Sequence, residues 1–177
     1  MHVEYGNTRV VLLFSFFVVK FPRVRCWDAL HTLVDCLRDK SVGIRGDKFE
    51  GRPLMTALAY LFSGITANRR EYMFAKKHPS SDAITPSYAL LFGGIVHLQR
   101  RGIALHEDEP RWKRFVGLLE QRKVVNPDLC NIDNFSECEG AMWIHDCGWR
   151  LSVEMLDEFA LELLNEVNVH RQNAVLV

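Results

Sequence analysis

One apolar stretch, Ser-Tyr-Ala-Leu-Leu-Phe-Gly-Gly-Ile-Val-His-Leu at positions 87–98, decides the predicted fold. It follows Pro86 and runs into Gln99-Arg100-Arg101-Gly102. A run that is apolar on every side, opened by proline and closed by basic residues and glycine, is typical of a buried helix. The Gly93-Gly94 pair costs such a helix about 2 kcal/mol relative to alanine, so a neighbouring backbone or ligand is expected to need the space. We therefore predict an all-α bundle around a central helix at about 86–101.

The flanking segments supply the other helices of this bundle. Apolar residues recur every three or four positions, as on the buried face of a helix, in segments 24–38, 54–62, 67–77, 111–125 and 143–169. Segment 9–20 suits either a helix capped by Asn7 or Thr8 or a strand, because it is rich in β-branched and aromatic residues. The prediction is seven or eight helices in a single domain spanning residues 1–177.

Composition narrows the class of partner and the compartment. The 177 residues include 22 basic and 22 acidic side chains, and this zero net charge argues against binding to nucleic acid and favours a protein partner. Five cysteines at irregular spacings indicate reduced thiols in the cytoplasm. The apolar run 10–19 is too short to span a bilayer, so a core element is expected there rather than a signal peptide, and no transmembrane anchor is predicted.

The motifs of enzymes and metal sites are not found in the sequence. Cys130, Cys138, His145 and Cys147 have gaps that match no usual zinc motif. There is no Gly-x-Ser-x-Gly elbow and no phosphate-binding loop, and His145-Asp146 is interpreted as a surface pair rather than an acid–base pair. We predict no enzyme activity, no metal and no cofactor.

Three short segments carry distinctive residue combinations. Segment 143–155 contains Trp143, Ile144, Gly148, Trp149, Val153 and Glu154, segment 89–94 ends in Phe-Gly-Gly, and segment 42–50 contains Val42, Gly46, Asp47 and Phe49. In this order they resemble the second homology segment, the end of the first homology segment and the BH3 core of the Bcl-2 family of apoptosis regulators. The resemblance covers most of the chain in the family's order. A compact member without a membrane anchor is typical of a virus-encoded homologue.

The resemblance implies a pro-survival protein that binds BH3 helices of Bim, Bak or Bax type in a hydrophobic groove, and so blocks permeabilisation of the mitochondrial outer membrane. Its expected location is the cytoplasm, or the periphery of that membrane in a host cell. The implied groove residues are Phe49, Leu54, Leu58, Leu61, Phe62, Tyr72, Phe74, Phe92, Gly93 and Gly94. The arginine of the first homology segment has no counterpart, and its candidate substitutes are Arg69, Arg70, Lys76 and Lys77.

Two alternatives remain open at this level. With the same fold, the chain could be pro-apoptotic and present segment 42–49 as its own BH3 helix. From another class, it could be an all-α self-associating protein, such as a homodimer, whose groove is filled by a second copy.

Overall fold

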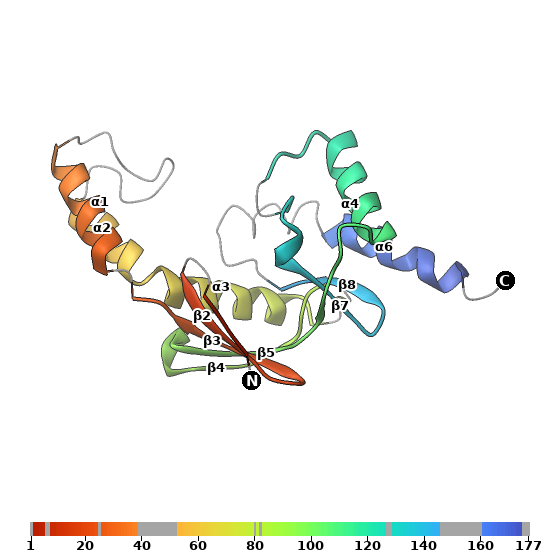
Figure 1. Cartoon of the computed structure of the whole chain (residues 1–177), viewed down its shortest axis with the longest axis horizontal. Coiled ribbons are helices and arrows are strands. Elements are labelled where there is room, and N and C mark those ends of the chain that lie inside the picture. The colour runs from red at the N-terminus through yellow and green to blue at the C-terminus, as the bar shows by residue number, and fades with distance from the viewer. Residues whose placement is uncertain are drawn as a thin grey trace.

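The protein is described by a computed structural model, and the residues that it describes are 2–5, 8–24, 26–38, 53–79, 81, 83–126, 129–145 and 161–174. Within them the chain forms two antiparallel sheets and five α-helices. The predicted all-α bundle is therefore wrong, and the protein is of mixed α/β class (Figure 1).

The first sheet carries the N-terminal region. Its strands are β1 (His2–Tyr5), β2 (Arg9–Leu13), β3 (Phe17–Pro22), β4 (Ser87–Leu91) and β5 (Val96–Arg100), in the spatial order β1-β2-β3-β5-β4. Every neighbouring pair is antiparallel, and Lys20 of β3 lies opposite His97 of β5. Segment 9–20, which the sequence left open between helix and strand, is thus two strands joined by a short turn.

The stretch predicted as the central helix is a β-hairpin. β4 and β5 pair through Leu91 and Val96, and the turn between them is the short 3-10 helix η1 (Phe92–Gly94). All three turn residues have positive φ, at 50° for Phe92, 67° for Gly93 and 115° for Gly94. The two glycines are required because such angles strain residues that carry a Cβ. Phe92 is 77% exposed, so this stretch is not the centre of the molecule.

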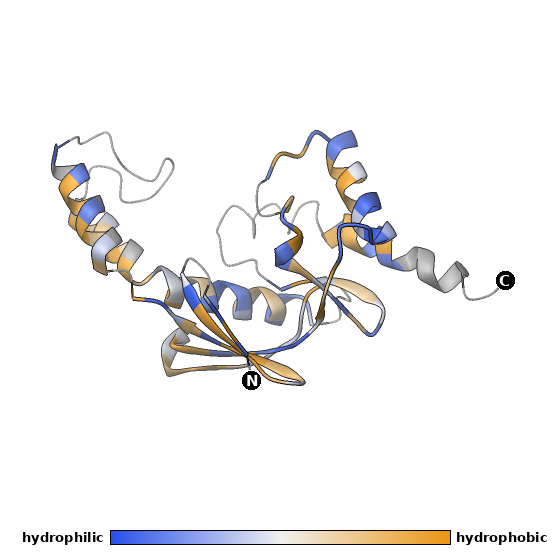
Figure 2. Ribbon diagram, viewed as in Figure 1, coloured by the Kyte–Doolittle hydropathy of each residue, from blue (hydrophilic) through white to orange (hydrophobic). Residues whose placement is uncertain are grey.

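The helices that lie between β3 and β4 in the sequence agree better with the prediction. The predicted helices 24–38, 54–62 and 67–77 correspond to α1 (Cys26–Arg38), α2 (Pro53–Leu61) and α3 (Ser63–Lys77). α3 lies across the first sheet, whereas α1 and α2 pack against each other and project away from it (Figure 1). Both helices of this projecting pair carry hydrophobic residues (Figure 2). Several of these side chains are exposed, among them Trp27, Leu30 and Leu54.

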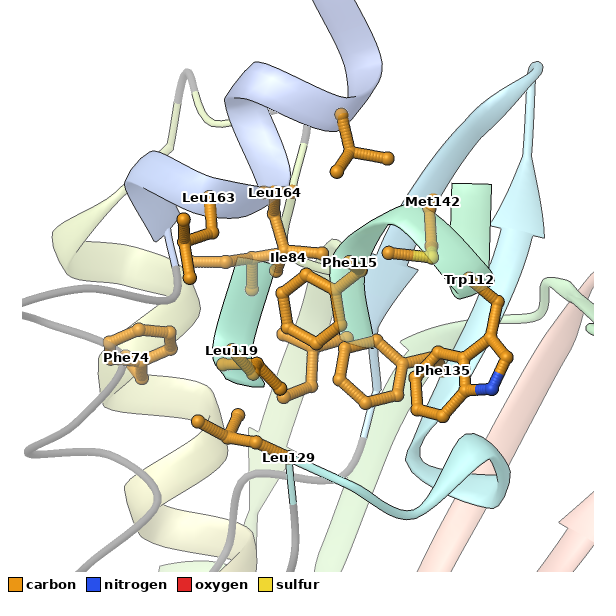
Figure 3. Close-up of a cluster of buried hydrophobic side chains, with 13 residues drawn as sticks. Phe74, Ile84, Trp112, Phe115, Leu119, Leu129, Phe135, Met142, Leu163 and Leu164 are labelled. Atoms are coloured by element: carbon orange, nitrogen blue, oxygen red, sulfur yellow. The ribbon is translucent and has the colours of Figure 1, made fainter. Parts of the chain in front are cut away.

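The second half of the chain builds the apolar core. The sheet β6 (Ile103–Ala104), β7 (Phe135–Cys138) and β8 (Ala141–Ile144) packs with α4 (Pro110–Gln121) and α6 (Leu161–Ala174), and the 3-10 helix η2 (Ile132–Asn134) precedes β7. The buried rings of Trp112, Phe115 and Phe135 pack against one another in tilted arrangements, and Phe74 reaches this cluster from α3 (Figure 3). The predicted helix 143–169 begins instead as strand, because Trp143 and Ile144 belong to β8.

Backbone hydrogen bonds and close contacts join the two sheets. Ile144 forms a parallel bridge with Ile84, and the Thr85 N–H donates to the Ile144 carbonyl at 3.0 Å. Gly102 lies against Ser136, where a Cβ would approach the Ser136 hydroxyl to 2.3 Å. These contacts bring the end of β8 next to α3 and the first sheet.

Candidate functional site

A buried ion cluster lies between α3 and the first sheet. Glu71 of α3 is 1% exposed, and its two carboxylate oxygens bind different cations. Oε1 accepts from the Arg9 guanidinium of β2, and Oε2 accepts from Lys20 Nζ of β3 at 2.8 Å. Both cations are at least 95% buried. Because buried ionised groups are costly unless paired, such a cluster inside a 177-residue protein points to a functional role.

The two cations keep Glu71 ionised. Burial alone would raise the pKa of this carboxyl, because it disfavours the charged form. The positive charges of Arg9 and Lys20 outweigh that effect, and the pKa lies well below the usual 4.5. Glu71 is therefore a permanent anion at neutral pH.

His97 of β5 is the third group that faces Glu71. Its Nδ1 lies 3.4 Å from Glu71 Oε2 and has no hydrogen-bond partner among the described residues, while its Nε2 is 2.9 Å from the Ser87 hydroxyl. Burial lowers the pKa of His97 below 6.5, and the Glu71 carboxylate offsets only part of this shift. The imidazole is therefore neutral at pH 7.

One face of α3 holds Glu71 against the sheet. Asn68 Nδ2 donates to the carbonyls of Lys20, at 3.3 Å, and of Gly94, at 2.8 Å. At Gly64 a Cβ would come within 2.3 Å of the Thr8 carbonyl oxygen, so only glycine allows the helix to approach so closely. Positions 64, 68 and 71 recur every three or four residues, which places them on one side of the helix.

The end of β8 meets the cluster at Lys20. Lys20 Nζ donates to the His145 carbonyl oxygen at 2.6 Å. The His145 N–H donates to the Asn134 carbonyl at 2.9 Å, and the Ile144 N–H donates to Ala83 at 2.9 Å. The backbone at 144–145 is thus fixed from both sides. The next residue in the sequence, Asp146, lies outside the described residues.

Asn134, whose carbonyl accepts from the His145 N–H, and its neighbour Asp133 also carry side-chain oxygen atoms. Asp133 belongs to η2 and has an exposed side chain, and Asn134 directly precedes β7. The Asn131 side chain accepts from the Asp133 N–H at 3.1 Å and so fixes this turn. Carboxylate and amide oxygens are of the kind that Mg²⁺ binds, although the described residues contain no group of three His, Cys, Asp or Glu that could hold a metal ion by itself.

The predicted groove residues are spread over several environments. Leu54, Leu58 and Phe62 are exposed on or next to α2, Leu61 and Tyr72 are half-buried, and Phe74 is 3% exposed within the apolar core. Phe92 and Gly93 form the exposed hairpin turn with the buried Gly94, and Phe49 lies outside the described residues. The binding of BH3 helices stays an untested prediction, and the described residues offer no helical groove in its support.

The other predicted segments fall largely outside the description. Trp143 and Ile144 are buried in β8, but Gly148, Trp149, Val153 and Glu154 lie outside the described residues. The same holds for the BH3-like residues Val42, Gly46, Asp47 and Phe49. Of the four zinc candidates, Cys147 is not described, and no metal-binding group of three His, Cys, Asp or Glu occurs among the residues that are.

The sequence does not predict the ion cluster of Glu71, Arg9 and Lys20. Lys20 and Glu71 are 51 positions apart, and no motif spacing connects them. The available signal was a lysine at the end of the apolar run 10–19, since a strand that is otherwise apolar buries a charge only with a partner.

Comparison with known protein families, curated proteins and solved structures gives no match for this chain. Among the described residues, no helix has both the length and the apolar character needed to cross a membrane.

Proposed function

We propose that this chain is a nucleoside-triphosphate-binding domain of protein-kinase type, in which Lys20 binds the phosphates. The observation that carries the proposal is the ion pair between Lys20 on β3 and Glu71 on α3. Protein kinases hold the α- and β-phosphates with a lysine on their third strand, which pairs with a glutamate on the following helix αC. Here, too, the helix that bears the glutamate lies between the third and fourth strands of an antiparallel sheet.

Sequence around the cluster supports the same interpretation. Phe17-Val18-Val19-Lys20 is similar to the Val-Ala-Ile-Lys motif of kinases, and Asp146-Cys147-Gly148 is similar to Asp-Phe-Gly. The kinase aspartate of Asp-Phe-Gly is a magnesium ligand. Asp146 directly follows His145, whose carbonyl oxygen accepts from Lys20. In the sequence, an acidic residue therefore directly follows the residue whose carbonyl contacts the lysine, and magnesium-nucleotide binding requires an acidic residue.

The second proposed metal ligand comes from η2. In kinases the catalytic loop His-Arg-Asp-Leu-x-x-x-Asn supplies it through the final asparagine. Matched without gaps, segment 126–133 places Asp133 at that position, and its neighbour Asn134 directly precedes β7. Bound Mg²⁺ would neutralise phosphate charge, and either Asp133 or Asn134 supplies an oxygen ligand of the kind it needs.

Two departures from the kinase pattern limit the expected affinity. The connection between β1 and β2 contains a single glycine, Gly6, whereas kinases have a glycine-rich loop over the phosphates at this place. Lys20 Nζ already donates to Glu71 and to the His145 carbonyl, so only one of its three N–H groups is left for a phosphate. We therefore expect dissociation constants in the high-micromolar to millimolar range.

Calorimetric titration of the full chain with ATP or GTP, with and without Mg²⁺, tests the proposal. We expect saturable binding that requires Mg²⁺ and that is lost in Lys20→Met. The control Lys113→Met removes an exposed lysine, and we expect it to bind as the wild type does. Asp133→Ala and Asn134→Ala separate the two candidate ligands, because the variant that loses the ligand should lose the Mg²⁺ dependence. A folded wild-type chain that binds neither nucleotide at millimolar concentration contradicts the proposal.

Phosphoryl transfer to a hydroxyl acceptor is the second candidate function. It is favoured by Asp128-Leu129, which matches the aspartate and leucine of the kinase catalytic loop, although Asn126-Pro127 replaces histidine and arginine. In kinases this aspartate accepts the proton of the acceptor hydroxyl. Transfer of labelled γ-phosphate to mixed protein acceptors should be abolished in Asp128→Asn, while nucleotide binding stays unchanged. Equal transfer by this variant would rule out the assigned role.

A further inference from the structure

We infer that Arg9 is a positioning residue of the proposed nucleotide site, which holds Glu71 and α3 permanently in the arrangement that Lys20 needs. The inference rests on the proposed function, because the role of Lys20 comes from there. It adds a second cation from a different strand to the two-residue ion pair of kinases.

Arg9 and Lys20 divide the Glu71 carboxylate between them. Arg9 is the first residue of β2 and lies opposite Pro22, while Lys20 lies opposite Val11. Arg9 binds Oε1, and Lys20 binds Oε2. Each cation thus has its own oxygen, and Lys20 can turn toward a phosphate without leaving Glu71 uncompensated.

The backbone around Arg9 is fixed independently of any ligand. The Arg23 N–H donates to the Thr8 carbonyl at 2.8 Å, and Gly64 of α3 lies against Thr8 and Pro22. Asn68, one turn further along α3, donates to the carbonyls of Lys20 and Gly94. The contacts of Gly64, Asn68 and Glu71 therefore hold one face of α3 against the sheet at three successive positions along the helix.

Moving α3 away from the sheet would leave two buried cations without their shared carboxylate. Breaking two buried ion pairs at once is costly, so the outward position of α3 is strongly disfavoured. Kinases whose helix αC moves use that movement to control the lysine–glutamate pair. In this chain we expect the pair to be assembled before nucleotide binds, so its control by movement of α3 is lost.

The first experiment measures α3 directly by amide hydrogen exchange of the wild-type chain without nucleotide. Residues 67–77 should exchange only by global unfolding, because no smaller opening frees the helix. In Arg9→Gln, which keeps a hydrogen-bond donor but removes the charge, the same amides should exchange faster by a local opening. Unchanged exchange of α3 in this variant overturns the inference. If Arg9→Gln does not fold, the wild type decides: an increase of α3 protection on nucleotide binding overturns it.

The second experiment measures Mg²⁺·ATP affinity as a function of pH. Glu71 is faced by Arg9 of β2, Lys20 of β3 and His97 of β5, so loss of the Arg9 charge makes the carboxylate easier to protonate. We expect Arg9→Gln to weaken binding about tenfold, as the loss of a charge-assisted hydrogen bond does, and to lose binding at a higher pH than the wild type. Arg9→Lys should recover most of the affinity. The exposed control Arg114→Gln should match the wild type.

The results distinguish the two proposals. A wild-type chain that binds no nucleotide overturns the proposed function, while slow exchange of α3 that depends on Arg9 still establishes how the helix is held. A chain that binds nucleotide with the same affinity and acid limit in Arg9→Gln overturns the role of Arg9 alone.

Discussion

The two halves of this protein hold a helix on a sheet by different means. α3 covers the first sheet through charged and polar groups, among which Glu71, Asn68 and His97 are fully buried. α4 and α6 cover the second sheet through an apolar cluster that contains Phe115, Phe135 and Leu164. Apolar packing stabilises a fold without needing exact partners, whereas a buried ion cluster is stable only when each member is paired. The first half is therefore expected to be stable only while each of its buried charges is paired, whereas the second half depends on apolar packing.

The largest effect is expected in the apolar half. Phe115→Ala removes a fully buried ring that contacts Trp112 and Phe135, and such a cavity destabilises a fold by about 3–5 kcal/mol. Urea denaturation followed by circular dichroism measures this loss. The exposed Val125→Ala is the control and should change stability by less than about 0.5 kcal/mol. Equal stability of the two variants would mean that the apolar cluster is not the main source of stability.

A slightly smaller effect is expected when Glu71 is replaced. Glu71→Gln keeps the shape of the side chain but removes the carboxylate that both Arg9 and Lys20 bind, which should destabilise the protein by about 3 kcal/mol. The control Glu139→Gln removes a carboxylate that is 68% exposed and should change little. Wild-type stability in Glu71→Gln would show that the polar half does not depend on its ion pairs.

The pH dependence of stability is expected to come from the first half, where His97 and Glu71 are buried. His97 has a lowered pKa in the fold, so the unfolded chain binds more protons, and stability falls as the pH drops below 6.5. Glu71 also has a lowered pKa, so its contribution is complete above 4.5 and is lost below that value. Each group contributes a slope of at most about 1.4 kcal/mol per pH unit.

His97→Gln should remove the first of these slopes, because glutamine keeps a polar group near Ser87 but does not titrate. Thermal unfolding between pH 7 and pH 5 measures it, with the exposed His106→Gln as the control. An unchanged slope in His97→Gln would contradict the assignment of His97 as the group that titrates there.

The smallest effect is expected at the surface. Asp108 pairs with Lys113 at 3.0 Å, but its side chain is 97% exposed, so water and salt screen the attraction. Asp108→Ala should lower the free energy of unfolding by less than about 0.5 kcal/mol in urea denaturation. A larger loss would show that a pairing distance alone, without burial, is enough to matter in this protein.

The helices were the most predictable part of the fold. The three-to-four spacing of apolar residues gave α1, α2, α3 and α4 to within a few residues at most ends. The prediction of a helix at 87–98 is wrong because a short run that is apolar on all sides has the same pattern in a buried helix and in strands. Its Gly93-Gly94 pair was the contrary signal, since adjacent glycines inside an apolar run also mark a hairpin turn.

The candidate site could be predicted only in part. Trp143 and Ile144 are predicted as site residues from the family resemblance, and in the structure they belong to the buried strand that leads to His145. Lys20 and Glu71 are not predicted from the sequence, because their contact depends on α3 lying across the sheet. Periodicity along a helix gives the face that Glu71 shares with Asn68 and Gly64, but it does not identify the strand that this face meets.

The sequence by itself determined where α1, α2, α3 and α4 form, because the apolar face of an amphipathic helix depends on neighbours three or four positions away. Only the tertiary structure decided that segments 9–22 and 87–100 join in one sheet, and that Arg9, Lys20 and His97 meet around Glu71. The physical reason is that strand pairing and charge pairing act between residues distant in the chain. Their partners are fixed by the packing of the whole molecule rather than by any local pattern.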